Sequence, residues 1–233
     1  TLAMTAYGDL DVSVIDGKPP GRRPVRTLLL YESQRRRLEE AVRQELAAGR
    51  QAYVICPLVE ESEKSDLKAA VQTADRLAKS VFPEYKVGLV HGRMSSGEKD
   101  AVMSGFAAGA VRVLVATTVI EVGVDVPNAS VMVLEHAERL GLAQMHQLRG
   151  RIGRGEHGGI CYLLAAPYLS EEARARLSAM VRTDDGFVIA EEDLVLRGPG
   201  EILGTRQSGI PDLRVGDREA ARAAFDALPF LKA

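Results

Sequence analysis

The chain has 233 residues, of which 46% are hydrophobic and 27% charged, and its formal net charge is −2. This composition is typical of a folded globular protein, and it excludes a disordered chain and a strongly basic nucleic-acid-binding domain. No apolar run reaches the length of a membrane span and no signal peptide opens the sequence, so we expect a cytoplasmic protein without membrane contact. Cys56 and Cys161 lie in apolar runs without metal-ligand spacing, which is typical of core residues.

Predicted strands and helices alternate from the start of the chain. Residues 6–16 alternate as an edge strand does, and the continuous apolar run of residues 25–31 predicts a buried strand. A helix is expected over residues 33–48, with the arginines of residues 35–37 on its solvated face and Gly49 as its stop. A strand (51–59), a helix (67–81) and a strand (86–92) follow.

The alternation continues through the middle of the chain. Ser95 and Glu98 form a predicted capping box, which opens a helix that runs to Gly109. Strands are expected at 111–117 and 130–136, a helix at 142–149 and a strand at 159–166. This order predicts an α/β fold with a mostly parallel sheet covered by helices on both faces. Ligands of such sheets bind beyond the carboxyl ends of the strands, where Thr117 lies.

The pattern changes after Pro167, and we place a domain boundary there, between residues 1–167 and 168–233. Residues 170–182 predict a helix with Ser170 as its cap. A short helix and a glycine-rich loop should follow, and residues 217–228 predict a terminal amphipathic helix.

The segment QLRGRIGRG, residues 147–155, is the most informative motif. Arg151 and Arg154 are three residues apart, so on one helical turn their guanidinium groups would converge on one anion. Gly150 and Gly153 permit close approach of the backbone. The motif therefore predicts phosphate chemistry, and the alternative is a solvated basic turn.

A second candidate site is the segment ATTVIEVGVDVPNA, residues 116–129. The hydroxyls of Thr117 and Thr118 and the carboxylates of Glu121 and Asp125 surround Gly123 and suit contacts with phosphate and ribose; the alternative is a connecting loop. At the end of the preceding strand, the Gly92 amide could contact a phosphate, although by itself this segment is better explained as an ordinary strand end.

Two kinds of site are absent from the sequence. Glu135, His136 and Glu138 lack the spacing of a helical zinc site. The phosphate-binding loop GxxxxGK[ST] is missing, because the glycines at residues 92 and 97 are followed by Glu98 and Lys99. The chain thus supplies arginines without a phosphate cradle.

Three segments in this order, HGRMSSGEKDAVMSGFAAG, ATTVIEVGVDVPNA and QLRGRIGRG, resemble motifs IV, V and VI of the second RecA-like domain of superfamily 2 helicases. The tail DGFVIAEEDLVLRGPGEILGTRQSG resembles the translocation motif of RecG-type branch migration helicases and Mfd-type translocases, and GTRQSG is the RecG-like version. The resemblance covers nearly the whole chain. It implies a RecA-like three-layer domain followed by a helical hairpin and loop.

The resemblance also implies roles for individual residues. Residues matching Arg151 and Arg154 reach the γ-phosphate of ATP, in a motif that begins at Gln147. The ATP and Mg²⁺ are held mainly by the first RecA-like domain. Residues matching Glu121, Gly123 and Asp125 link nucleotide to DNA, and those matching Gly92, Thr117 and Thr118 contact DNA. Residues matching Arg176, Arg197 and Gln207 couple closure of the domains to translocation.

The implied partners are branched duplex DNA and, within one monomeric parent chain, a first RecA-like domain and a wedge domain. This sequence lacks both domains, so we expect it to be inactive by itself. The implied function is that of the C-terminal motor half of an ATP-dependent DNA helicase in recombination and repair. The alternatives are an Mfd-type translocase fragment, a non-enzymatic DNA-binding or regulatory module, and a small-molecule α/β enzyme, for which no acid–base pair or cofactor motif is found.

Overall fold

The computed structural model describes residues 24–57, 63–117, 126–155 and 158–197. Within these residues a six-stranded sheet has the order β1-β6-β5-β2-β4-β3, and all its pairings are parallel. The strands are β1 (Val25–Tyr31), β2 (Gln51–Cys56), β3 (Val87–Val90), β4 (Val113–Thr117), β5 (Ala129–Leu134) and β6 (Gly159–Ala165). The predicted α/β class is confirmed. The strand expected at residues 6–16 and the helix expected at 217–228 lie outside the described residues.

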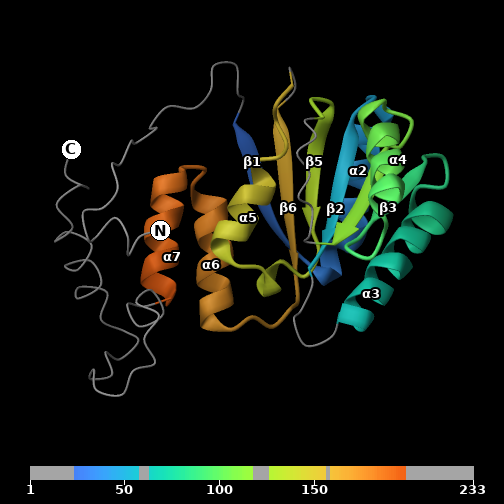
Figure 1. The fold of residues 1–233 in the computed structure, drawn as a ribbon. Helices are drawn as coiled ribbons and strands as arrows, with labels where there is room; N and C mark the ends of the chain where they lie inside the picture. Colours follow the sequence, from blue (N-terminus) through green and yellow to red (C-terminus); the bar gives the residue numbers. More distant parts are fainter. Residues whose placement is uncertain (1–23, 58–62, 118–125, 156–157, 198–233) are drawn as a thin grey trace, which may run out of the picture.

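Helices cover both faces of the sheet and make a three-layer structure (Figure 1). On one face lie α2 (Arg35–Ala47) and α3 (Glu63–Arg76); on the other lie α4 (Ser96–Ala107), α5 (Leu142–Arg149) and α6 (Glu171–Arg182). The last described helix, α7 (Gly186–Arg197), packs against α5 and α6. Side chains of α6 and α7, including Met180 and Ile189, share the apolar cluster of that face. The boundary at residue 167 stays a prediction.

Strand β2 shows how the two apolar clusters are separated by the sheet. All six of its residues are buried. Tyr53 and Ile55 belong to the cluster under α4 and α5, whereas Val54 belongs to the cluster under α2 and α3. Alternate side chains of a strand point to opposite faces, so a strand covered on both faces is apolar throughout.

The prediction that residues 25–31 form a buried strand is wrong in its burial. Strand β1 lies at the edge of the sheet, and of its residues only Thr27 is buried. The strand is apolar because both of its faces are partly covered. Leu29 packs against the cluster under α4 and α5, and Leu28 and Leu30 pack against the cluster under α2 and α3. Among the described strands, β1 pairs with β6 alone.

Most helix ends follow the predicted signals. Gly49 and Gly109 adopt left-handed backbone with φ of 88° and 76° just after α2 and α4. The capping box is confirmed, since the Ser95 amide donates to Glu98 Oε2 at 2.8 Å and the Glu98 amide donates to Ser95 Oγ at 3.3 Å. The helix expected at 67–81 instead starts at Glu63, ends at Arg76 and continues as a π-helical turn, η2 (Leu77–Val81).

None of the helices in the described part of the chain combines the length and hydrophobicity that crossing a bilayer requires.

Candidate nucleotide and nucleic-acid site

The arginine turn, defined here as residues 150–155, follows directly on α5. Arg151 and Arg154 are both exposed. The prediction that they share a helical turn is wrong, because α5 ends at Arg149, Gly150 is its C-cap and Gly153 has a left-handed φ of 73°. The two guanidinium groups are therefore presented by a turn. Gln147 is exposed on the last turn of α5.

Core packing holds the backbone of the arginine turn in place. Ile152 is fully buried in the cluster under α5. A Cβ added to Gly155 would lie 2.4 Å from the carbonyl oxygen of Pro127, so only glycine fits there. Arg154 Nε and Nη2 donate to the Gly150 carbonyl at 3.3 Å, which folds this side chain back along the turn. A fixed backbone with exposed guanidinium groups is well suited to bind an anion such as a phosphate.

The arginine turn adjoins a buried arginine to which the sequence assigned no role. Arg149 is 3% exposed, although it stands only two residues before Arg151. Its sequence environment offers one signal, since positions 142, 145 and 149 follow the i, i+3, i+7 spacing of the buried face of α5.

The carboxyl ends of β3 and β4 bring two predicted DNA-binding positions to the same edge of the sheet. Val90 is paired with Ala116, so Thr117, the last residue of β4, and Gly92, two residues after β3, lie at the ends of neighbouring strands. Gly92 is exposed, and a Cβ there would meet no atom within 4 Å. Thr117 is 2% exposed, and its hydroxyl has no hydrogen-bond partner among the described residues.

Several other predicted positions cannot be placed in the site. Thr118, Glu121, Gly123 and Asp125, which follow β4, lie outside the described residues, as does Gln207. Arg197 is the last residue of α7, and its side chain is not among those described.

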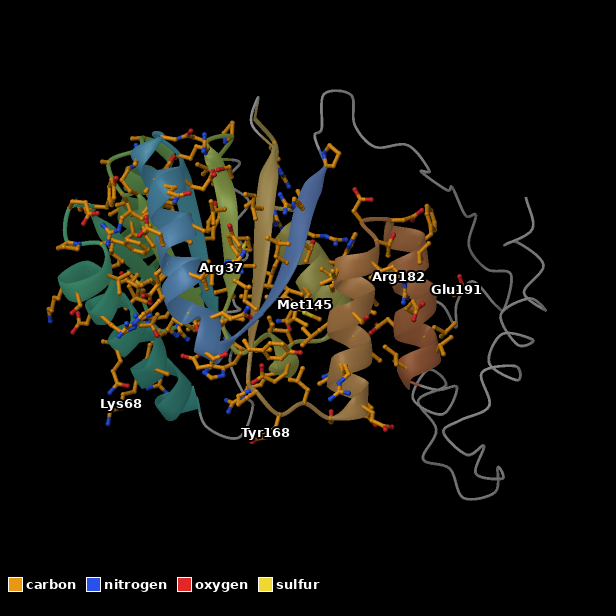
Figure 2. All side chains as sticks on the ribbon, turned by 180° about the vertical axis from the view of Figure 1, so that it is seen from behind. Arg37, Lys68, Met145, Tyr168, Arg182 and Glu191 are labelled. Carbon is orange, nitrogen blue, oxygen red and sulfur yellow. The ribbon has the colours of Figure 1, made fainter. Side chains whose placement is uncertain are left out.

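An ion-pair network that the sequence did not predict lies at the carboxyl edge of the sheet. Arg35, the first residue of α2, binds Glu135 through two hydrogen bonds: Nη1 to Oε1 at 2.8 Å and Nη2 to Oε2 at 2.7 Å. Nη2 also donates to Glu32 at 2.9 Å. The assignment of Arg35 to a solvated face is therefore wrong, whereas Arg36 and Arg37 are exposed as predicted (Figure 2, where Arg37 is labelled). These neighbouring arginines thus differ in their burial, because the start of α2 faces the end of β5.

This network shifts the proton affinities of its members. The hydrogen bonds that Arg35 donates to Glu135 raise the pKa of its guanidinium, and those that it donates to Glu32 raise it further. The hydrogen bond from Arg35 lowers the pKa of the Glu32 carboxyl below its ordinary value. Both groups are therefore charged at neutral pH, and the network joins the N-terminus of α2 to the end of β5.

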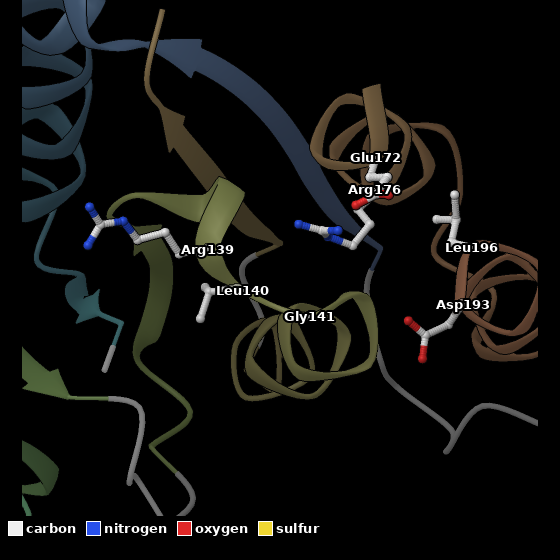
Figure 3. A pocket seen from close by; sticks show the side chains of 7 residues that line it. All are labelled: Arg139, Leu140, Gly141, Glu172, Arg176, Asp193 and Leu196. Atoms are coloured by element: carbon white, nitrogen blue, oxygen red, sulfur yellow. The ribbon is translucent and has the colours of Figure 1, made fainter. Parts of the chain in front are cut away.

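A cavity of about 280 Å³ lies between the start of α5 and the α6–α7 pair (Figure 3). Arg176, a predicted coupling residue, lines it, and its Nη2 donates to the Glu138 carbonyl at 2.9 Å. The Nε atom of Arg176 is buried and has no hydrogen-bond partner within the described part of the chain. The acidic side chains of Glu172 and Asp193 also line the cavity, so its charges are mixed.

Within the described residues, no three histidine, cysteine, aspartate or glutamate side chains gather as metal ligands would. His136 has a left-handed backbone with φ of 47°, the only such non-glycine residue described. Its Nδ1 lies 3.5 Å from Glu138 Oε1.

Comparison with known proteins gives matches along most of the chain. Residues 33–156 match the model of the helicase conserved C-terminal domain. Residues 183–224 match the model of the C-terminal part of domain 3 of the ATP-dependent DNA helicase RecG. The first match includes the arginine turn, and the second includes α7.

Individual relatives agree with these family matches. The RecG of Acidithiobacillus ferridurans is 57% identical over 231 residues, which are 99% of this chain and 34% of the relative. The RecG of Escherichia coli K12 is 55% identical, with 93% of this chain and 31% of the relative covered. A solved structure of RecG bound to a three-way DNA junction matches with a TM-score of 0.73 and 46% identity, over 97% of this chain and 28% of that one.

The chain spans about a third of the length of the curated relatives that it matches. The similarity includes the sheet, the arginine turn and the helices after it, and it favours RecG over the other classes considered from the sequence. The chain therefore belongs to the family of helicase conserved C-terminal domains, with a RecA-like fold, and is similar along nearly all its length to the C-terminal part of RecG.

Proposed function

We propose that this chain is the C-terminal motor half of an ATP-dependent DNA helicase of the RecG type. In this proposal the parent protein translocates on duplex DNA and remodels stalled forks and branched junctions. The observation that carries the proposal is the arginine turn, a core-anchored loop that exposes Arg151 and Arg154.

Arg151 and Arg154 would reach the γ-phosphate of ATP bound on a preceding RecA-like domain. Gln147 lies in the last turn of α5, just before the arginine turn. In phosphoryl transfer, negative charge spreads over the equatorial oxygens of the phosphate. An arginine supplied by a second domain stabilises that charge in the transition state and raises the rate of hydrolysis by roughly a thousandfold or more. The exposure of both side chains fits such a ligand. By the resemblance to superfamily 2 helicases, Mg²⁺ would be held mainly by the preceding domain together with the ATP.

DNA would be contacted at the carboxyl edge of β3 and β4. Gly92 is exposed there without obstruction, which allows a phosphate to approach its backbone. Thr117 is the last residue of the neighbouring strand β4, and its buried hydroxyl finds no hydrogen-bond partner among the described residues. Contacts of this kind read phosphates, so binding would not depend on base sequence. The RecG–junction structure supports branched DNA as the partner.

The proposal is tested by Arg151→Ala in the full-length protein that carries this chain. DNA-stimulated ATP hydrolysis should fall by roughly a thousandfold, because the transition-state charge loses its arginine, while DNA affinity should stay within about twofold. Arg37→Ala is the matched control, since it removes an exposed arginine on the outer face of α2. Hydrolysis by Arg151→Ala at the rate of the control would contradict the proposed role.

The same assays separate chemistry from movement. We propose that Arg176, Arg197 and Gln207 couple closure of the domains to translocation. Alanine variants of Arg197 and Gln207 should then keep ATP hydrolysis and the melting temperature while losing junction unwinding. Parallel loss of all three properties would instead indicate a bracing role for these residues.

A further inference from the structure

Arg149 makes contacts quite unlike those of the other arginines in its motif. Its Nη1 donates to the carbonyl oxygens of Met180 and Thr183, both at 2.8 Å, and to Thr27 Oγ1 at 3.2 Å. Its Nη2 lies 3.0 Å from Nδ1 of His146. Arginine can only donate, so His146 Nδ1 is the acceptor and the neutral ring carries its proton on Nε2.

These contacts join the end of α5 to the end of α6. Met180 lies in the last turn of α6 and Thr183 is its C-cap, where carbonyl groups lack partners within the helix. A guanidinium group satisfies them and also favours the negative end of the helix dipole. Through Thr27 the same side chain reaches the edge strand β1. One buried cation thus connects three elements that are far apart in the sequence.

Helix α7 is held to the same group of helices. A Cβ added to Gly186, the first residue of α7, would lie 3.1 Å from His146 Nε2, so the backbone of α7 approaches α5 closely. Arg182 at the end of α6 pairs with Glu192 of α7 at 2.6 Å. Met145 of α5 shares an apolar cluster with α6 and α7 (Figure 2 labels Met145 and Arg182). The helices α5, α6 and α7 therefore pack as one unit.

We infer that Arg149 is a positioning residue that fixes the arginine turn to the α6–α7 pair. The turn starts at Gly150, directly after Arg149, and Ile152 anchors it to the same core. A displacement of Arg151 and Arg154 as the motor closes on ATP is then passed on to α6 and α7. This inference rests on the proposed function, because it requires closure over a nucleotide.

The test uses the full-length protein with Arg149→Met, which keeps an unbranched chain of similar length and removes the guanidinium donors. The main readout is the number of junctions unwound per ATP hydrolysed, with native-state hydrogen exchange across residues 179–183 as the second. We expect the ratio of unwinding to hydrolysis to fall by about tenfold, in the range of ordinary coupling effects, with ATP hydrolysis within about threefold of wild type. Exchange near Met180 and Thr183 should become faster.

Ser170→Ala is the matched control. Ser170 Oγ accepts from the Ala173 amide at 3.1 Å and caps the opposite end of α6, so its loss destabilises the same helix without touching Arg149. Its ratio of unwinding to hydrolysis should equal that of wild type. Arg149→Lys keeps the charge but not the forked donors, and should give an intermediate ratio; it serves as the test variant if Arg149→Met does not fold.

Different failures have different meanings in this experiment. If the Arg149 variants lose unwinding and hydrolysis in proportion, or keep the ratio of Ser170→Ala at a similar melting temperature, the positioning role is overturned. If the wild-type full-length protein shows no DNA-stimulated hydrolysis, the proposed function itself fails.

Discussion

At the scale of single residues, Gly155 shows how little space separates the arginine turn from the segment before β5. A Cβ there would lie 2.4 Å from the Pro127 carbonyl oxygen, whereas a Cβ on Gly97 in α4 would meet nothing within 4 Å. We expect Gly155→Ala to destabilise the protein by about 1–3 kcal/mol, because backbone must move to relieve the overlap.

Gly97→Ala provides the matched control for this measurement. It should stabilise α4 by up to about 1 kcal/mol, since alanine favours a helix more than glycine does. Chemical denaturation of both variants measures the difference. Equal stability of Gly155→Ala and wild type would show that the turn can shift without cost.

The two cysteines give a residue-scale prediction about pH. Burial raises the pKa of the Cys161 thiol to about 12, and burial together with the charge of Glu135 raises that of Cys56 to about 12. At pH 8 only about one folded molecule in ten thousand carries the thiolate, so alkylation should be slow unless the chain unfolds. Rates with iodoacetamide, measured for each cysteine by peptide mass spectrometry in native and unfolded protein, test this.

The sign of the stability effect follows from the same pKa values. The folded thiols keep their protons when unfolded thiols, with a pKa near 9.0, have released them. Their contribution is therefore complete below about pH 9 and falls as pH rises toward 12, by about 1.4 kcal/mol per pH unit for each thiol. Native-state alkylation as fast as in the unfolded chain would contradict the burial of these groups.

At the scale of elements, the pair of Arg35 and Glu135 joins α2 to β5. The Glu135 side chain is 8% exposed and that of Arg35 is 23% exposed, so removing one partner leaves a largely buried charge. We expect Arg35→Ala to destabilise the protein by about 2–4 kcal/mol. Arg37→Ala on the exposed face of α2 should change stability by less than about 0.5 kcal/mol.

Denaturation curves of Arg35→Ala and Arg37→Ala show whether Arg35 contributes a stabilising buried ion pair or only a surface charge. If Arg35→Ala is no less stable than Arg37→Ala, the pair contributes only surface charge. The double variant Arg35→Met with Glu135→Leu should recover much of the lost stability, because an apolar pair leaves no charge unpaired.

Elements with a strong periodic or capping signal were predictable from sequence. Helix α5 runs from Leu142 to Arg149 as expected, and Ser95 and Ser170 cap α4 and α6. The edge position of β1 was not predictable, because an apolar run shows that two faces are covered but not whether both edges are paired. The burial of Arg35 and Arg149 depends on contacts with Glu135 and Met180, far along the chain, which no local pattern encodes.

The candidate site was predictable to a similar, partial extent. The glycine and arginine spacing located the arginine turn, but the left-handed Gly153 means that it is not a helical turn. The roles of its residues remain predictions, as do those of Gly92 and Thr117. Glu121, Gly123, Asp125 and Gln207 lie outside the described residues.

At the scale of the whole molecule, the described part of the chain presents arginines without a phosphate cradle. We expect residues 1–233 by themselves to show no DNA-stimulated ATP hydrolysis, since the sequence lacks the loop that holds the phosphates. Phosphate release with and without duplex DNA measures this, with the full-length protein as the positive control. Turnover by residues 1–233 within about tenfold of that control would contradict the prediction.

The pairing of β1 with β6 also bears on how the chain folds as it is made. Val25 lies beside Gly159, so the first described strand has no partner among the described strands until synthesis has passed β6. At about 5–20 residues per second, that wait is on the order of ten seconds. During it an apolar strand leaves the ribosome with its backbone hydrogen-bonding groups unpaired, a state prone to association with other chains. Chaperone binding and misassembly during translation should therefore concentrate at β1.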